Sequence, residues 1–112
     1  MTPMDPLDAF QMLDLRVGRV RNCRAARGAK KPAYKLTVDF GPLGVRGSSA
    51  QLTDLYSPEQ LIGRLVIAPV NLGVRRIAGF ASEALVLGVP DEDGRVVLLA
   101  VERDVPPGGG IF

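Results

Sequence analysis

The stretch Tyr34-Lys35-Leu36-Thr37-Val38-Asp39-Phe40 decides the fold, because its apolar and polar residues alternate without interruption. This alternation has the period of a β-strand with one face in a core and the other in solvent. The glycines and proline of residues 41–44 then predict a tight turn, and residues 45–52 predict a returning strand with a polar centre. That centre either forms a polar recognition surface or is the solvent side of an ordinary strand. Its members are Ser48, Ser49 and Gln51.

Two further elements are expected before this strand. The apolar residues from Leu15 to Val20 again alternate, and their parity changes beside Gly18, which predicts a strand with a β-bulge at that glycine. In front of it, Asp5 and Pro6 have the pattern of a helix N-cap and first helical position. Apolar residues follow at helical spacing, so we expect a short helix that ends near residue 14.

Beyond residue 52 the pattern predicts a short helix and more strands. Ser57, Pro58 and Gln60 have the spacing of a capping box, so a helix of one or two turns is expected before Gly63. Three apolar runs follow, and the last two are joined across Asp93-Gly94 as a β-hairpin. The runs cover residues 65–70, 84–89 and 96–101. Because they are apolar on both faces, we expect a second covering layer from the terminal helix or from another subunit.

The order of these elements favours an all-β fold. It predicts a five-stranded Greek-key barrel of the oligonucleotide-binding (OB-fold) class, with a short N-terminal helix and a short helix between strands three and four. A β-sandwich is the alternative. The 112 residues have the length of one domain, which we expect over 1–112, with 1–14 as a helical extension and 102–112 as a C-terminal packing segment. The residues expected to pack on the barrel or across a dimer interface are Leu7, Phe10, Ile111 and Phe112.

The composition excludes several classes of functional site. The chain has no His, no Trp and a single cysteine, Cys23. This excludes disulfide frameworks, Cys/His zinc sites and hydrolase triads that need an imidazole base. Residues 91–94, three acids followed by a glycine, lack the first and twelfth ligands of a calcium loop, so they predict a hairpin turn. We therefore expect no catalytic residue, no metal, no cofactor and no enzyme activity.

The sequence also predicts where the protein is found. The N-terminal residues lack the basic and apolar regions of a signal peptide, and no apolar run is long enough to cross a membrane. A single cysteine fits a reducing compartment. We expect a soluble cytoplasmic protein with no membrane insertion.

The charged residues are distributed unevenly. The net charge is only +2, yet residues 16–35 contain eight bases and no acid. Clustered bases neutralise phosphates and release counterions, so this basic segment is a candidate surface for RNA or an acidic partner. The alternative is a solvated strand face whose bases are balanced by acids elsewhere in the fold. From this segment the candidate binding residues are Arg19, Arg21, Lys30, Lys31 and Lys35.

A second basic feature follows the apolar run of residues 65–70. Arg75 and Arg76 lie in a glycine-containing loop, and they could extend the first surface because a guanidinium group binds phosphate through a planar fork. Alternatively, one of them pairs with Glu83, which otherwise stands alone at the start of an apolar strand. Both alternatives stay open, and the two arginines join the candidate set together with Ser48, Ser49 and Gln51.

Several blocks of sequence together resemble a known family. They are similar to the tRNA-binding domain family and, within it, to the stand-alone secretion chaperones of bacteria. The resemblance covers almost the whole chain, although residues 72–74 (Leu-Gly-Val) replace a common Phe-Pro-Pro and Lys30 replaces a usual Arg. The blocks are residues 15–20 (LRVGRV), 31–36 (KPAYKL), 48–51 (SSAQ), 75–80 (RRIAGF), 82–83 (SE) and 85–88 (LVLG).

The resemblance implies an OB-fold barrel with an added N-terminal helix, assembled as a non-catalytic cytoplasmic homodimer. Stand-alone relatives are implied to hold unfolded or precursor polypeptides for export, with the secretion ATPase as a partner. Relatives that are fused to methionyl-tRNA synthetase, or free-standing, are implied to bind tRNA by its shape. We take the export chaperone as the first hypothesis, and tRNA binding through the strand and loop of residues 16–35 as the alternative.

Overall fold

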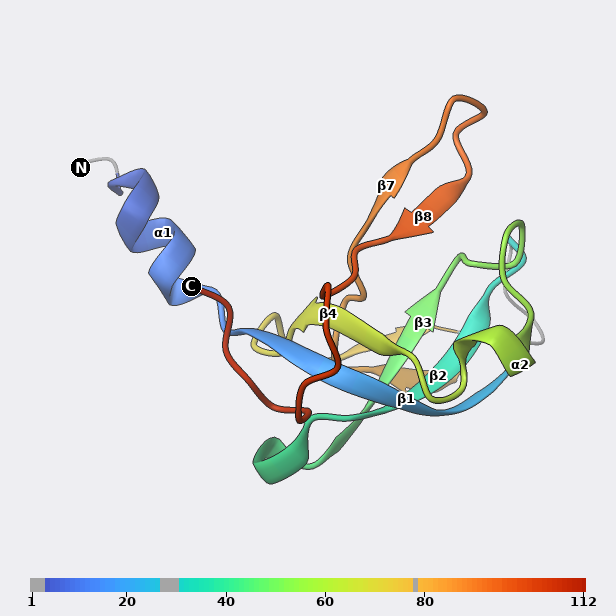
Figure 1. The fold of residues 1–112 in the computed structure, drawn as a ribbon, viewed down its shortest axis with the longest axis horizontal. Helices are drawn as coiled ribbons and strands as arrows, with labels where there is room; N and C mark the ends of the chain where they lie inside the picture. Colours follow the sequence, from blue (N-terminus) through green and yellow to red (C-terminus); the bar gives the residue numbers. More distant parts are fainter. Residues whose placement is uncertain (1–3, 27–30, 78) are drawn as a thin grey trace.

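The computed structural model describes residues 4–26, 31–77 and 79–112 (Figure 1). Four strands form one antiparallel sheet in the order β3-β2-β1-β4, while β5–β6 and β7–β8 are hairpins. No helix in these ranges is long and apolar enough to cross a membrane. The elements in chain order are α1 (Pro6–Met12), β1 (Leu15–Ala25), β2 (Tyr34–Asp39), the 3-10 helix η1 (Gly41–Leu43), β3 (Val45–Ala50), α2 (Pro58–Leu61), β4 (Leu65–Pro69), β5 (Arg75–Ile77), β6 (Phe80–Ser82), β7 (Gly88–Pro90) and β8 (Val96–Leu98).

Residues 83–87 close the barrel between β3 and β4, although they form no regular strand. The backbone N–H groups of residues 83 and 84 both donate to the carbonyl oxygen of Gly47 on β3. Those of residues 85 and 87 donate to carbonyl oxygens of β4, and the N···O distances of all four bonds are 2.8 to 3.4 Å. The barrel is therefore formed by β1 to β4 and this segment, and the count of strands differs from the five predicted because β5 to β8 form two additional hairpins. The all-β OB-fold architecture is confirmed, with α2 between the third and fourth strands as predicted.

Gly18 allows the first strand to cross the core at close range. A Cβ atom at this position would lie 2.5 Å from Cγ1 of Val38 and 2.7 Å from Cε1 of Phe40. The β-bulge predicted at Gly18 in fact lies further along the strand, between Val20 and Asn22. The parity change in the sequence reflects the absence of a side chain at Gly18, which leaves its backbone buried beside the Phe40 ring.

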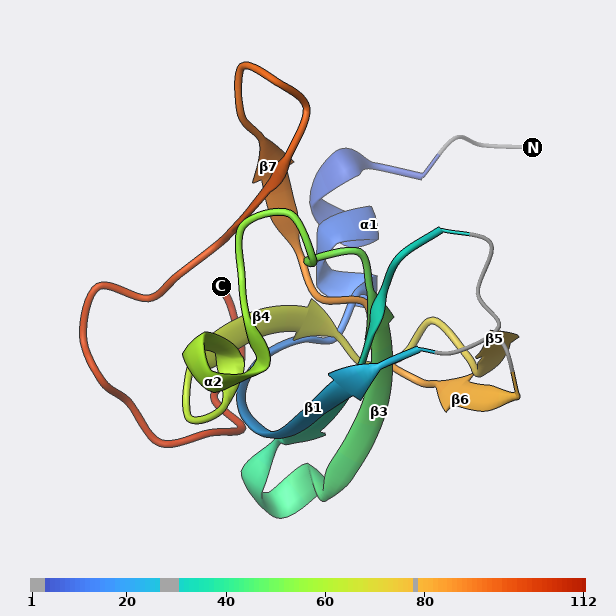
Figure 2. The same ribbon diagram turned by 90° about the vertical axis from the view of Figure 1, so that its right-hand side faces the viewer.

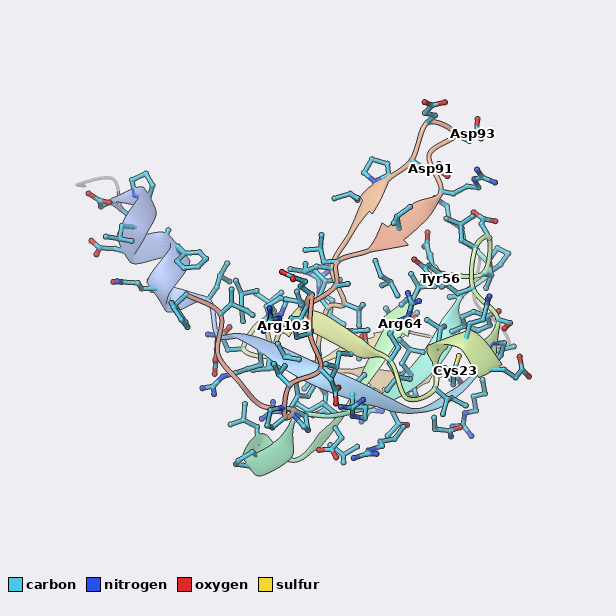
Figure 3. The ribbon with its side chains drawn as sticks, viewed as in Figure 1. Cys23, Tyr56, Arg64, Asp91, Asp93 and Arg103 are labelled. Atoms are coloured by element: carbon cyan, nitrogen blue, oxygen red, sulfur yellow. The ribbon has the colours of Figure 1, made fainter. Side chains whose placement is uncertain are left out.

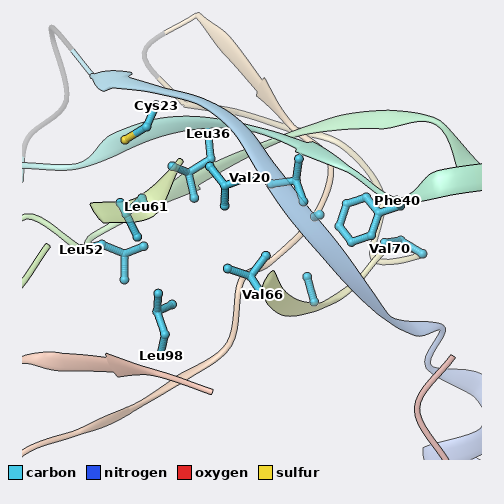
Figure 4. Packing of buried hydrophobic residues seen from close by; sticks show 12 residues of the cluster. Val20, Cys23, Leu36, Phe40, Leu52, Leu61, Val66, Val70 and Leu98 are labelled. Atoms are coloured by element: carbon cyan, nitrogen blue, oxygen red, sulfur yellow. The ribbon is translucent and has the colours of Figure 1, made fainter. Parts of the chain in front are cut away.

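The core lies between the sheet, α2 and β8 (Figure 4). Its largest fully buried side chain is Phe40, at the end of β2. The other fully buried apolar side chains come from three strands and from α2, and the alternation of residues 34–40 predicted those of β2. They are Leu36, Leu61, Val20, Val38 and Val66.

Cys23 belongs to this core and is not a reactive thiol. Burial raises its pKa to about 11, and the negative charge of Glu59 adds to the shift. The folded state therefore holds the thiol proton more tightly than the unfolded state does. The stability that results is complete below pH 9.0, the ordinary pKa, and is lost as the pH rises towards 11.

The same shift predicts slow alkylation of Cys23. Because only the thiolate reacts, we expect iodoacetamide at pH 8 to modify the native thiol about 100-fold more slowly than the unfolded one. Mass spectrometry of samples quenched over time, with and without urea, measures both rates. Equal rates in the two conditions would contradict the buried position.

Helix α1 projects from the barrel and covers none of it (Figure 1). The side-chain amide of Asn71 fixes its end, because Oδ1 accepts from the N–H of Asp14 at 2.9 Å and Nδ2 donates to the carbonyl of Met12 at 2.7 Å. Leu7 and Phe10 nevertheless remain exposed. Within the single chain, the prediction that the terminal helix supplies a covering layer is therefore wrong.

The C-terminal segment runs along the first part of β1. The N–H groups of Gly108 and Ile111 donate to carbonyl oxygens of β1 at 2.7 and 2.9 Å, and the N–H of Val17 donates back to residue 109. The Ile111 side chain is half-buried, but Phe112 is completely exposed. Backbone pairing therefore anchors this segment, and the expected packing of Phe112 on the barrel does not occur.

The β7–β8 hairpin also projects from the barrel (Figure 1). Its turn is held by the carboxylate of Asp91, which accepts from the backbone N–H of Asp93 and of Arg95 and from Nε of Arg95. This confirms the hairpin predicted across residues 93–94. In the single chain Val89 and Val97 of this hairpin are exposed, so the expected cover by another subunit stays a prediction.

Candidate nucleic-acid interface

Acids from other parts of the fold neutralise the first bases of the basic segment. Nη2 of Arg19 lies 2.9 Å from Oδ1 of Asp104, and Nη2 of Arg21 lies 2.9 Å from Oδ2 of Asp39. The hydrogen bond from Arg21, together with that from the N–H of Gly41, holds the pKa of Asp39 below its usual value. The alternative of balanced bases is therefore correct for this part of β1, and Arg19 and Arg21 are poor candidates for binding a phosphate.

The later bases of the basic segment differ from Arg19 and Arg21 in their ion pairing. Arg24, Lys31 and Lys35 have no acidic partner within the described part of the chain. Arg24 stands directly opposite Lys35 in the pairing of β1 with β2. Like charges at opposed positions destabilise a sheet, so a bound anion between them would relieve the repulsion. Lys30, which the sequence also predicted, lies outside the described residues.

These cations continue into a row that runs from β1, β2 and β3 to the separate β5–β6 hairpin. Ser49 stands opposite Lys35, its N–H donates to Oγ of Ser82 at 3.0 Å, and Ser82 stands opposite Arg75. Opposed residues share one face of a sheet. We call this set the cationic row, and it consists of Arg24 on β1, Lys35 on β2, Ser49 on β3, Ser82 on β6 and Arg75 on β5.

The β5–β6 hairpin brings its end of the row against the barrel. Figure 2 shows this hairpin on the side of the molecule where β1 ends. A Cβ atom at Gly47 of β3 would lie 2.6 Å from the carbonyl oxygen of Ala81 and 2.8 Å from Cζ of Phe80, so only glycine allows this approach. The Phe80 ring lies 5.6 Å from Nζ of Lys35, a cation–π distance. An aromatic face therefore accompanies the cations.

Neither arginine of β5 is neutralised by Glu83. Arg75 and Arg76 are exposed, and no ion pair joins them to any described acid. Of the two alternatives from the sequence, the structure supports an extension of the basic surface. Arg75 belongs to the cationic row, whereas Arg76 lies on the other face of the strand by the alternation of side chains.

Beside the cationic row lies a cavity of about 170 Å³ with a mixed lining. Its polar members are Ser49, Ser82, Arg75 and Glu83. Its apolar members come mainly from exposed positions, including Leu72 in the loop that departs from the family pattern. They are Leu72, Ile77, Ala84 and Leu85. The loop thus keeps an apolar side chain at the cavity despite the loss of Phe-Pro-Pro.

The predicted polar surface of β3 is only partly present. Ser48 is completely buried opposite Leu36, and its hydroxyl has no hydrogen-bond partner in the described part of the chain. Ser48 faces the core and cannot contact a partner, so its selection as a site residue is corrected. Ser49 belongs to the cationic row, and Gln51 is exposed beyond the end of β3.

The two tyrosines are held by structural contacts. The Tyr34 hydroxyl donates to the carbonyl of Tyr56 at 2.8 Å, and the Tyr56 hydroxyl accepts from the N–H of Leu98 at 3.0 Å. Arg64 lies over the Tyr56 ring, 5.1 Å from its centroid (Figure 3). Phe80 is therefore the aromatic residue that the structure brings to the cationic row, and sequence reasoning did not select it.

Sequence reasoning also missed Arg24 and Ser82 as individual site residues. Arg24 was part of the basic segment, but its position opposite Lys35 depends on the register after the bulge. Ser82 joins the cationic row only because β6 lies against β3, where its hydroxyl accepts a hydrogen bond from the N–H of Ser49. No local pattern places Arg24 opposite Lys35, because the bulge between Val20 and Asn22 shifts the pairing of the two strands.

Comparison with known proteins gives a consistent result. The family model described as "Putative tRNA binding domain" matches residues 15–109. The crystal structure of the chaperone CsaA from Bacillus anthracis is 44% identical, with a TM-score of 0.87 over 98% of this chain and 100% of that one. The CsaA chaperone protein from Picrophilus torridus is 41% identical, with a TM-score of 0.90 over 97% of this chain and 100% of that one.

A longer relative shares the same region. The methionine–tRNA ligase of Methanothrix thermoacetophila is 38% identical over 109 residues, which are 97% of this chain. The chain spans only 16% of the length of that ligase. The matched residues contain the whole barrel and both strands of the hairpin that carries Arg75, and the chain therefore belongs to the tRNA binding domain family.

Proposed function

We propose that this protein binds tRNA, or another folded RNA of similar shape, through the cationic row and without catalysing a reaction. The observation that carries the proposal is a row of cations without an acidic partner among the described residues. Arg24 and Lys35 oppose each other directly on β1 and β2, and Arg75 lines one cavity with Ser49 and Ser82 of the same row. Folded RNA offers phosphates at regular spacing, and proteins recognise it mostly by its shape and backbone. Phe80 adds one aromatic face for an unstacked base.

The test is a titration of labelled tRNA at several salt concentrations. Each neutralised phosphate contributes a slope of about −0.7 to −0.9 in a plot of log affinity against log salt. Three cations of the row, Arg24, Lys35 and Arg75, therefore predict a slope of about −2 to −3. The absence of a complex at low salt would contradict the proposal.

A second function is favoured by the exposed apolar residues. We propose that the protein is also a cytoplasmic chaperone that holds unfolded or precursor polypeptides for export, as a homodimer and with the secretion ATPase as a partner. Two CsaA chaperones match it over their whole lengths. The cavity beside the cationic row offers apolar side chains to a client, and α1 and the β7–β8 hairpin offer an uncovered apolar surface to a second copy.

Aggregation of a chemically denatured client tests the chaperone function. The double variant Leu72→Asp with Ile77→Asp should need about tenfold more protein for half-maximal suppression, because it removes two apolar contacts at the cavity. Light scattering after dilution of the client measures the suppression. The matched control is Ile62→Asp, an equally exposed apolar residue after α2 that lies outside the cavity. Equal losses in the two variants would remove the cavity from the proposal.

A further inference from the structure

Strand β5 has an open edge. It pairs with β6 alone, and its three residues are all exposed. No backbone hydrogen bond joins Arg75, Arg76 or Ile77 to any described segment other than β6. In an antiparallel pair, every second residue directs its N–H and C=O groups away from its partner strand. β5 therefore presents unpaired backbone groups that another strand could pair with.

The side chains of β5 lie on two faces of the strand. Arg75 and Ile77 both line the cavity, together with Leu72 and Leu85. Arg76, between them, is on the opposite face. A strand added at this edge would place alternate side chains over the cavity, because side chains opposite each other on paired strands share one face. An apolar side chain at one of these positions would enter the cavity beside Ile77.

The charges around the edge select the kind of polypeptide. Arg75 and Arg76 have no acidic partner among the described residues, and Lys35 belongs to the same cationic row as Arg75, with Ser49 and Ser82 between them. Glu83 is the single acid among the residues that line the cavity. The excess of positive charge favours acidic side chains and opposes basic ones.

We infer that β5 binds an extended polypeptide by strand addition, with apolar side chains over the cavity and acidic side chains beside Arg75 and Arg76. The inference rests on the proposed chaperone function and specifies how a client is held. Main-chain hydrogen bonds supply affinity without regard to sequence, while the cavity and the arginines add a preference. This combination fits a protein that holds many different unfolded chains.

The experiment uses a fluorescein-labelled ten-residue peptide in which Val and Leu alternate with Asp and Glu. Two further forms carry N-methyl groups on every second residue, in one register or in the other, and a fourth form replaces the acids with Lys. Fluorescence anisotropy with the full chain measures each affinity. We expect one N-methyl form to bind at least about tenfold more weakly and the other to stay within about twofold, because only one set of N–H groups faces β5.

The charge preference has its own controls. The Lys peptide should bind about tenfold more weakly than the acidic one. Arg75→Ser with Arg76→Ser should weaken the acidic peptide by a similar factor, whereas Arg103→Ser, an exposed arginine outside the cavity, should not. Thermal unfolding confirms that each variant is folded.

The outcomes separate this inference from the chaperone function. Equal affinities of the two N-methyl forms would overturn strand addition, even if the same preparation suppresses client aggregation. A register-dependent loss without any suppression would support strand addition and contradict the chaperone function. If no form of the peptide binds, the edge is covered by a second copy or serves RNA alone, and the inference is wrong.

Discussion

Phe40→Ala is expected to lower the free energy of unfolding by about 3–5 kcal/mol, the range for a large aromatic side chain removed from a packed core. The Phe40 ring is completely buried at the end of β2, against the backbone of Gly18. Small domains have total stabilities of about 5–15 kcal/mol, so this loss is a large fraction of the total. Urea unfolding followed by circular dichroism measures it, provided that the transition is two-state.

A matched control is Phe112→Ala, which removes the same ring from a completely exposed position. Its effect on the unfolding of the single chain should stay within about 0.5 kcal/mol. A cost below about 1 kcal/mol for Phe40→Ala would show that the ring is not a core residue. Concentration dependence of the Phe112→Ala result would instead show that the exposed ring lies in a subunit interface.

The elements that could be predicted from sequence are those whose signals are local. The alternation of residues 34–40 fixed β2, the capping box at Ser57 and Gln60 fixed α2, and Asp93-Gly94 marked the last hairpin. Each of these patterns acts within one element or one turn. The order of the elements then favoured an OB barrel, with a β-sandwich as the alternative.

The ion pairs could not be predicted in the same way. Arg19 and Asp104 are far apart in the chain, and Arg21 meets Asp39 only because β1 and β2 pair in one particular register. The bulge between Val20 and Asn22 sets that register. The basic segment looked uniform along the chain, but the fold divides it into a neutralised part and the part that contains Arg24 and Lys35.

The exposure of the outward face of β7 and β8 could not be predicted from sequence either. Their apolar residues on both sides suggested burial on both sides, yet Val89 and Val97 are exposed in the single chain. Hydrophobicity along a strand shows which side chains would gain from burial, but it does not show which surface covers them. The surfaces that remain uncovered here are therefore the ones we assign to a second copy.

Charge reversal in the cationic row should produce the largest loss of RNA binding. We expect Arg75→Glu to weaken tRNA binding about tenfold, Lys35→Glu by at least that factor, and the two together by at least about 100-fold, because each removes a charged contact to phosphate worth about 1.5 kcal/mol. Lys35→Glu has a second effect, since the new carboxylate would stand opposite Arg24 and neutralise it. Filter binding of labelled tRNA at low salt measures the affinities, and the salt slope should fall by about 0.7 to 0.9 for each lost contact.

Two control variants make this prediction specific to the row. Arg103→Glu changes the net charge by the same amount at an exposed site outside the row, so it should weaken binding by no more than about twofold. Arg21→Ser with Asp39→Ser removes an ion pair of the basic segment without changing the net charge. If the ion pair between Arg21 and Asp39 remains intact when RNA binds, this variant should bind tRNA as tightly as the wild type does. A loss equal to that of Lys35→Glu would mean that Arg21 leaves Asp39 to reach a phosphate, so that the whole segment 16–35, and not the cationic row, forms the interface.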